Sequence, residues 1–256
     1  MAPRPCFSAK IVGMHRFFIA PDNFAGDRVV LPEATAHQIR NVLRLRPGAA
    51  IVVLDNSGWE YEVLLRQVDR QQVVGEAVAK RPSPNEPSVQ LTLYQALMKR
   101  DKFEWVLQKG TEIGVSQFIP VVTQRSLVQE VDIKEGKQLR WEKIITEAAE
   151  QSRRGCIPTL QAPQTLAEAL AAHPAQPGLI AWEEADGLTI RSALGDGKRP
   201  SHVSLFIGPE GGFAAEEVEA AQTAGIQAIT LGKRILRAET AALVASALVL
   251  HELDII

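Results

Sequence analysis

From about residue 89 onward, the chain alternates short, continuous apolar runs with segments in which apolar residues recur every three or four positions. Continuous runs are typical of strands buried on both faces, and the longer repeat is typical of helices with one buried face. The runs predict strands over 89–97, 115–122, 179–182, 203–207 and 226–231, and the repeats predict helices over 100–112, 139–153, 214–224 and 239–253. This alternation predicts an α/β fold with a mostly parallel sheet covered on both faces.

The N-terminal part has a different pattern, in which β-branched runs are separated by tight turns. Strands are predicted over 51–55, 61–68 and 72–80, and the turn Asn56-Ser57-Gly58 indicates antiparallel pairing. A helix is predicted between Pro32 and Pro47. Its expected inward face consists of Ala36, Ile39, Val42 and Leu43. Together these elements indicate a small, barrel-like β domain.

The predicted boundary between the two parts is the segment 81–88. It holds three prolines and two serines in eight residues, a composition that sustains neither a helix nor a central strand. We therefore predict a β domain over 14–80, a linker over 81–88 and an α/β domain over 89–256. Residues 1–13 are expected to be a disordered extension.

The last predicted helix is apolar nearly all round. Its apolar residues are Leu243, Val244, Ala247, Leu248 and Leu250, so the helix must be buried on more than one side. A homodimer interface and a deep position within the chain both satisfy this requirement, and the sequence leaves the two open.

Composition narrows the class of protein. The chain has 256 residues, of which 46% are hydrophobic and 23% charged, as in a soluble globular protein. No apolar run approaches the roughly 20 residues of a membrane helix, and the first residues lack a secretory pattern. Cys6 and Cys156 are isolated, so we expect no disulfide framework, no metal site and a cytoplasmic location. The formal net charge of -2 still allows a local basic face for nucleic acid.

Two glycine-containing turns follow predicted strands, at Ile207–Gly212 and Leu231–Ala241. Ligands of open α/β sheets bind at the carboxyl ends of the strands, where these turns should meet. A dinucleotide is disfavoured because the G-x-G-x-x-G fingerprint is absent. A phosphate is disfavoured because Glu210 lies inside the first turn. The turns favour an uncharged or cationic ligand held by backbone groups and by an apolar slot of Ile207, Leu231, Ile235 and Leu236.

Several motifs in fixed order carry a family resemblance. They are HRFF near the start, QKGTEIGVSQFIP (108–120), RWEKIITEAAEQSRR (140–154), GPEGG (208–212) and LGKRILRAETA (231–241). With these motifs the chain resembles the RsmE family of ribosomal RNA methyltransferases, in the SPOUT superfamily, over essentially 14–256. The resemblance implies a deep trefoil knot in the C-terminal domain, a PUA-like N-terminal barrel, a homodimer and S-adenosylmethionine as cofactor. It also implies methylation of ring nitrogen 3 of a uridine in 16S ribosomal RNA, either free or in an assembled small subunit.

The resemblance also implies three cofactor loops, of which the turn after 179–182 is the third. The expected cofactor-binding residues are Ile207, Gly208, Pro209, Glu210, Gly211, Gly212, Leu231, Gly232, Ile235, Leu236 and Thr240. The glycines leave the main chain accessible to the ligand. A carboxylate at Glu210 is compatible with a sulfonium cation, although it would repel a phosphate.

The expected catalytic residues are Arg237, Glu239 and Glu210. We expect Arg237 to stabilise negative charge on the base oxygens, and one of the two glutamates to accept the N3 proton or orient the base. Glu239 has an equally good structural explanation, since an acid in the first turn of a helix complements the helix dipole.

Cations outside the pocket are expected to contact RNA phosphates. The candidates are Arg16, His37, Arg40, Arg44, Lys99, Arg100, Lys102 and Arg154. The cations at positions 37, 40 and 44 would equally well belong to a solvent-exposed helix surface. The charge of Arg154 would also complement the dipole at a helix C-terminus. Two other functions stay open: a non-catalytic ribosome-assembly factor that has kept the fold, and a methyltransferase acting on a different RNA.

Overall fold

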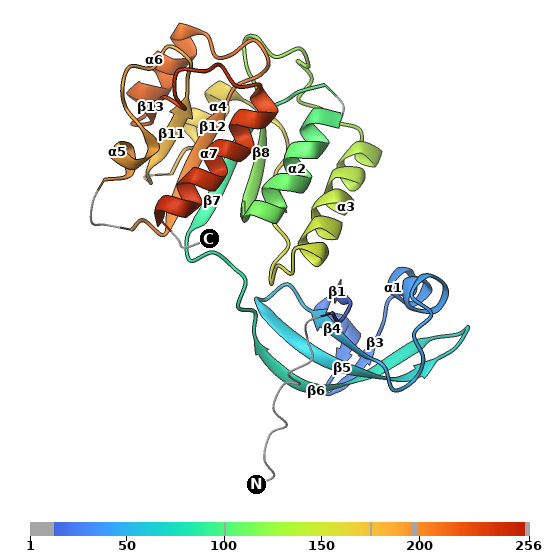
Figure 1. Cartoon of the computed structure of the whole chain (residues 1–256). Coiled ribbons are helices and arrows are strands. Elements are labelled where there is room, and N and C mark those ends of the chain that lie inside the picture. Colours follow the sequence, from blue (N-terminus) through green and yellow to red (C-terminus); the bar gives the residue numbers. More distant parts are fainter. Residues whose placement is uncertain (1–12, 100, 175, 196–198, 254–256) are drawn as a thin grey trace. The chain divides into compact units, whose positions relative to one another are not determined.

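A computed structural model describes residues 13–99, 101–174, 176–195 and 199–253 (Figure 1). The chain forms two compact units. The first contains the chain up to Glu86 together with Ala149–Ile157, and the second contains Pro87–Ala148 and the chain from Pro158 onward. Of the predicted extension 1–13, only Gly13 is among the described residues.

The first unit is built on a six-stranded sheet with the order β1-β4-β5-β6-β3-β2. Its strands are β1 (Arg16–Phe18), β2 (Phe24–Ala25), β3 (Arg28–Val30), β4 (Ala50–Leu54), β5 (Trp59–Val68) and β6 (Val73–Pro82), with a 3-10 turn, η1 (Pro21–Asn23). Neighbouring strands are antiparallel except β1 and β4, which are parallel. The three predicted strands are therefore found, and the short β1, β2 and β3 are added to them.

The predicted helix of the first unit is shorter and less regular than expected. It consists of α1 (Glu33–His37) and a π-helical turn, η2 (Gln38–Val42). In this turn the amide of Leu43 donates to the carbonyl of Gln38, five residues back, which rotates the following side chains relative to an α-helix. Ala36 and Ile39 are buried as predicted, but Val42 is 65% exposed, so its predicted inward position is wrong.

A buried ion pair joins three strands of the first unit. Glu60 is fully buried, and its Oε2 accepts from Arg16 Nη2 at 2.7 Å while its Oε1 accepts from Arg81. The Arg16 side chain is only 5% exposed. Its guanidinium is thus paired inside the sheet, and the predicted contact of Arg16 with RNA stays a prediction.

The boundary between the units falls within the segment 81–88 that was predicted as the linker, although its first two residues belong to a strand. Arg81 and Pro82 are the last residues of β6, and the division falls between Glu86 and Pro87. The Glu86 carboxylate accepts from Nε and Nη2 of Arg154 at 2.9 and 2.8 Å and from the Gly155 amide at 2.7 Å. Arg154 is 3% exposed and paired with Glu86, and its predicted role as an RNA contact stays a prediction.

The second unit contains a seven-stranded parallel sheet with helices on both faces. Its strands are β7 (Gln90–Ala96), β8 (Gln117–Val122), β9 (Thr159–Leu160), β10 (Gln164–Thr165), β11 (Gly178–Ala181), β12 (His202–Ile207) and β13 (Gln227–Ile229). The helices are α2 (Asp101–Ile113), α3 (Glu135–Gln151), which ends in the first unit, α4 (Leu166–Ala171), α5 (Ile190–Leu194), α6 (Ala215–Thr223) and α7 (Ala238–Leu253). The predicted α/β fold with a mostly parallel sheet is confirmed.

The strand order of this sheet is β10-β8-β7-β12-β11-β13, and β9 pairs with β8. One face packs against α4 and α6, where Tyr94 of β7 stacks on Phe206 of β12 with a centroid distance of 4.1 Å. Helix α7 crosses the other face and packs against α2 and α5 (Figure 1). The pattern missed α4, α5, β9 and β10, which are too short to show a clear period.

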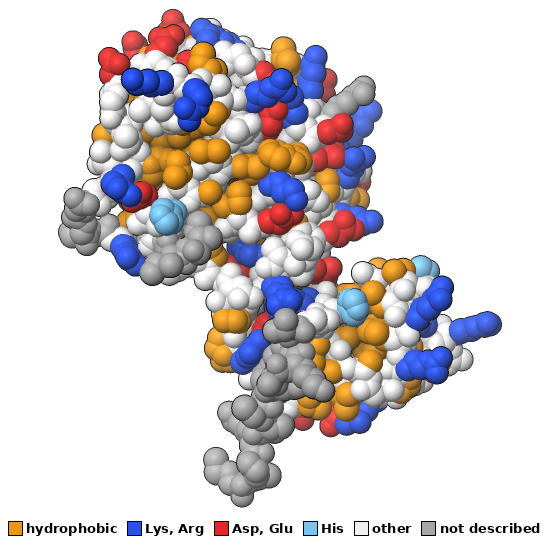
Figure 2. Space-filling view, in the orientation of Figure 1, with side chains coloured by type: hydrophobic (Ala, Val, Ile, Leu, Met, Phe, Trp, Pro, Cys, Tyr) orange, Lys and Arg blue, Asp and Glu red, His pale blue; other side chains and the backbone are white. Residues whose placement is uncertain are grey.

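Helix α7 is buried on one side only in this single chain. Ala242, Ala245 and Val249 are fully buried, whereas Val244 is 37% and Leu248 is 41% exposed. Hydrophobic side chains gather on the face of the second unit where α7 runs (Figure 2). A deep position within the chain therefore does not account for the whole apolar surface of α7. No helix among the described residues combines the length and apolarity needed to cross a membrane.

The burial of the Arg16–Glu60 ion pair predicts a large loss of stability when the Glu60 carboxylate is replaced by a neutral amide. We expect Glu60→Gln to lower the free energy of unfolding by roughly 3 to 5 kcal/mol, because it leaves the Arg16 charge buried without its counter-charge. Glu76→Gln is the control, since the Arg66–Glu76 pair is about half exposed and should contribute about 1 kcal/mol or less. Urea unfolding measures both values. Equal, small losses would show that burial does not strengthen the Arg16–Glu60 pair.

Candidate functional site

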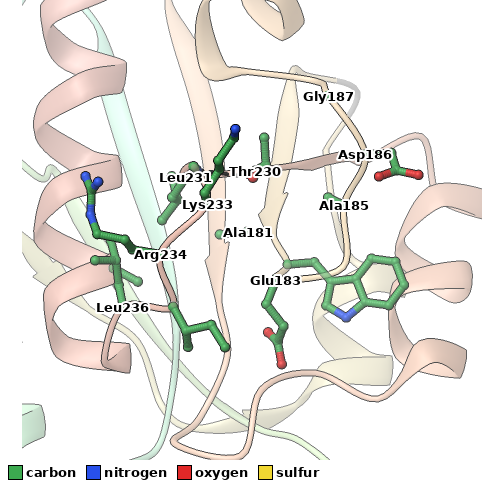
Figure 3. A pocket seen from close by; sticks show the side chains of 14 residues that line it. Ala181, Glu183, Ala185, Asp186, Gly187, Thr230, Leu231, Lys233, Arg234 and Leu236 are labelled. Atoms are coloured by element: carbon green, nitrogen blue, oxygen red, sulfur yellow. Dashed lines mark hydrogen bonds between the residues drawn. The ribbon is translucent and has the colours of Figure 1, made fainter.

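A pocket of about 480 Å³ lies where β11 and β13 end (Figure 3). Ala181 at the end of β11 is level with Ile207 of β12 and with Ile229 of β13, so three neighbouring strands stop at one edge of the sheet. The lining comes from the loop after β11 and the segment after β13. It comprises Ala181–Glu183, Ala185–Gly187, Thr230–Leu236 and Ala241.

Four of the predicted cofactor-binding residues line this pocket: Leu231, Gly232, Ile235 and Leu236. Ile235 is 86% exposed and forms part of the rim, while Ile207 is 1% exposed and belongs to the sheet core. Ile207 is not among the residues that line the pocket, so its place in the predicted apolar slot stays a prediction. Thr240 is not among the lining residues, although its neighbour Ala241 is.

The GPEGG turn touches the pocket through one lining residue, Glu183. A Cβ atom added to Gly212 would lie 2.5 Å from Oε1 of Glu183, and Gly212 has a φ of +69°, so both space and backbone favour glycine. The Gly212 amide donates to the Pro209 carbonyl at 3.0 Å, which closes the turn. Gly212 thus lies against Glu183, and residues 208–212 are not among those that line the cavity.

Charged residues of both signs lie in the pocket, and sequence reasoning missed them. Glu183 and Asp186 come from the loop after β11, and Lys233 and Arg234 from the segment after β13 (Figure 3). The sequence did contain a signal, because the turn after 179–182 was expected to be the third loop. These residues lie in loops, where the hydrophobic pattern has no regular period and cannot show which side chains face the cavity.

The predicted catalytic residues are only partly brought together. Glu210 and Glu239 both lie within 4 Å of the ammonium nitrogen of Lys102, at 3.3 and 3.7 Å. Oε2 of Glu239 is buried and has no hydrogen-bond partner among the described residues. Arg237, two residues before Glu239, is exposed. The structure therefore joins the two candidate carboxylates through a lysine that was predicted to contact RNA.

A second cation, Arg125, lies against the GPEGG turn and was not predicted. Its Nη1 donates to the Gly211 carbonyl at 3.1 Å. The neighbouring Gln124 amide donates to Glu217 of α6 at 2.7 Å, and Thr123 and Ser126 are buried and hydrogen-bonded to each other. This turn after β8 therefore holds Arg125 in place, and nothing in the local sequence pattern distinguishes it from other surface arginines.

The remaining predicted RNA contacts differ in their availability. His37, Arg44 and Lys99 are exposed, and Arg100 lies outside the described residues. Arg40 donates to the Asp69 carbonyl at 3.1 Å and pairs with Glu33. A groove of about 360 Å³ in the first unit is lined by Arg40, Arg44, Leu45, Arg46, Val68, Asp69 and Arg70. Within the described ranges, no three His, Cys, Asp or Glu side chains come close enough to hold a metal ion.

Comparison with known proteins identifies the family. Residues 84–250 match the family described as an RNA methyltransferase domain. A relative from Synechocystis named ribosomal RNA small subunit methyltransferase E is 34% identical over 242 residues, which cover 94% of this chain and 78% of the relative. The chain belongs to the RsmE family of methyltransferases. The family predicted from the sequence motifs is therefore confirmed.

Other RsmE relatives match with similar coverage. A Bacillus subtilis protein of the same name is 33% identical over 226 residues, covering 86% of this chain and 88% of the relative. The crystal structure of a ribosomal RNA small subunit methyltransferase E from Neisseria gonorrhoeae, bound to S-adenosyl methionine, has 33% identity and a TM-score of 0.82. That match covers 92% of this chain and 96% of the other. The two-part architecture is thus that of RsmE structures.

The contact between Arg125 and the GPEGG turn predicts a change in local stability. Arg125→Met removes a donor to the Gly211 carbonyl, which should destabilise the closed turn by about 1 kcal/mol and speed exchange of the Gly212 amide about fivefold. Hydrogen exchange followed by NMR measures this rate. Arg140→Met is the control, because Arg140 pairs with Glu104 and should leave the Gly212 amide unchanged. An unaltered rate in Arg125→Met would mean that the contact does not stabilise the turn.

Proposed function

We propose that this RsmE-family chain transfers a methyl group from S-adenosylmethionine to ring nitrogen 3 of a uridine in small-subunit ribosomal RNA. The observation that carries the proposal is the pocket at the common edge of β11, β12 and β13, lined by the LGKRIL segment, with Gly212 of the GPEGG turn against Glu183 of the lining. Relatives named ribosomal RNA small subunit methyltransferase E support small-subunit ribosomal RNA as the substrate class.

The residues of the pocket fit the proposed cofactor. A volume of about 480 Å³ suits a ligand of this size. S-Adenosylmethionine carries two cationic groups, a carboxylate and an apolar ring. The carboxylates of Glu183 and Asp186 would hold a cationic group, and Lys233 or Arg234 would hold the carboxylate. Trp182 and Leu231 offer apolar surface for the ring.

When bound, the cofactor supplies a methyl group on a sulfonium sulfur, which becomes a neutral sulfide when the carbon–sulfur bond breaks and a carbon–nitrogen bond forms. Uracil N3 carries a proton at neutral pH, so this proton has to leave. We assign its acceptance, or the orientation of the base, to Glu239, whose buried Oε2 is open to a donor. Exposed Arg237 would stabilise negative charge on the base oxygens.

Three further features of the proposal concern assembly and location. The exposed apolar side chains of α7, including Val244 and Leu248, support a homodimer formed through this helix. The arginine-lined groove of the first unit, with Arg44 and Arg46, supports RNA binding by that unit. Ribosomal RNA as substrate implies a cytoplasmic location. The trefoil knot stays a prediction from the family resemblance.

Methyl transfer from labelled cofactor is the direct test. Small ribosomal subunits, naked 16S RNA and tRNA are offered in parallel, and the modified base is mapped. We expect label in small-subunit RNA, on N3 of one uridine, and none in tRNA. Label in tRNA alone would favour a different RNA substrate, and binding of small-subunit RNA without transfer would favour a non-catalytic assembly factor.

Two substitutions should separate cofactor binding from chemistry. Gly212→Ala places a methyl group against Glu183 and should lower the affinity for S-adenosylmethionine at least tenfold by calorimetry. Gly225→Ala is the matched control, because Gly225 also has a positive φ, +82°, but has open space around it. Arg237→Ala should retain cofactor affinity and lose about a hundredfold or more in transfer rate. Full transfer by Arg237→Ala would remove that residue from the proposed mechanism.

A further inference from the structure

Lys102 lies where two segments of the candidate site meet. Its ammonium nitrogen is 3.3 Å from Oε1 of Glu210, in the GPEGG turn, and 3.7 Å from Oε2 of Glu239, in the first turn of α7. Lys102 itself is in the first turn of α2. One cation therefore connects three segments that are far apart in the sequence.

The Glu239 carboxylate depends on this cation. Its side chain is 15% exposed, and Lys102 is the cation that lies within 4 Å of it among the described residues. The distance of 3.7 Å is that of an ion pair and is too long for a hydrogen bond. A buried carboxylate oxygen without a donor is costly, and such groups are concentrated at functional sites.

Packing fixes the position of the Lys102 side chain. The next residues of α2 that face inward, Phe103, Val106 and Leu107, are buried, and α2 packs against α7. The Lys102 side chain is 37% exposed, compared with 74% for Lys143 on the surface of α3. Its ammonium is therefore held between two carboxylates, in a position that suits the ordering of the site better than a contact with RNA phosphate.

We infer that Lys102 is a positioning residue for methyl transfer, whose ammonium keeps Glu239 beside Glu210 and so fixes where the Glu239 carboxylate meets the acceptor base. This inference rests on the proposed function. Without the ammonium, two like charges would face each other with one oxygen buried, and their repulsion would separate the GPEGG turn from the start of α7.

The test compares Lys102→Met, which removes the charge, with Lys102→Arg, which keeps it. Transfer to the RNA that the wild-type protein methylates is measured with varied RNA and saturating S-adenosylmethionine. We expect Lys102→Met to lower kcat at least tenfold and to leave KM for RNA within twofold, and Lys102→Arg to stay within threefold of the wild type. Lys143→Met is the control and should change neither constant.

The salt dependence of KM distinguishes positioning from RNA contact. Loss of a residue that binds phosphate would raise KM for RNA and make the salt dependence shallower by about one unit of slope. Lys102→Met should leave that slope unchanged. If the whole loss appears in KM and in the slope, or if kcat stays within twofold, the positioning role is wrong.

A double-mutant cycle tests whether Lys102 acts through Glu239. The pair Lys102→Met and Glu239→Gln should lose little more activity than Glu239→Gln alone, whereas independent roles would multiply the losses. Thermal unfolding and cofactor affinity identify any variant that fails to fold. If Lys102→Met fails to fold, the positioning role is still tested by Lys102→Arg, which keeps the charge and should retain activity, and by Glu239→Gln, which should lower kcat. An inactive wild-type protein would contradict the proposed function, while an active wild type with an unaffected Lys102→Met contradicts only the inference.

Discussion

The site depends on parallel pairing in register. Because β11 pairs with both β12 and β13 in the same direction, Ala181, Ile207 and Ile229 end their strands at one level. Three loops must then leave the sheet at one edge, and each loop supplies a different part of the site. A shift in the pairing of β11 would turn its buried side chains to the other face, so the packing of the sheet core also holds the loops together.

The three loops divide the chemistry among them. The loop after β11 supplies carboxylates, and the segment after β13 supplies cations and apolar surface. The GPEGG turn contacts the first of these loops through Gly212, which has no side chain. Gly212 has a φ of +69°, which favours glycine, and a side chain there would displace the Glu183 carboxylate. Helices α2 and α7 also bring charged groups to the GPEGG turn, where Lys102 lies near both Glu210 and Glu239.

Much of this fold could be predicted because long segments carry a clear period. The burial of Phe103, Val106 and Leu107 in α2, and the positions of β7, β8 and β12, follow directly from the pattern. The pattern could not predict which cations are paired with carboxylates inside the protein. Arg16, Arg154 and Lys102 look like any surface cation in the sequence, and only tertiary structure shows that Glu60, Glu86 and Glu210 neutralise them. Val42 was misplaced because a π-helical turn changes the period within a single helix.

The contribution of Ala149–Ile157 to the first unit has a consequence for how this architecture can be rearranged in evolution or by design. The chain passes from the first unit to the second at Pro87. It returns to the first unit for Ala149–Ile157, which comprise the end of α3 and the turn after it, and enters the second unit again at Pro158. No single cut therefore separates the two units into complete pieces. A fragment that begins at Pro87 would carry Arg154 without Glu86. One that ends at Glu86 would lack the donors to its carboxylate, which come from Arg154, Gly155 and Cys156. Exchange of the first unit alone would therefore have to supply both the segment up to Glu86 and the segment Ala149–Ile157.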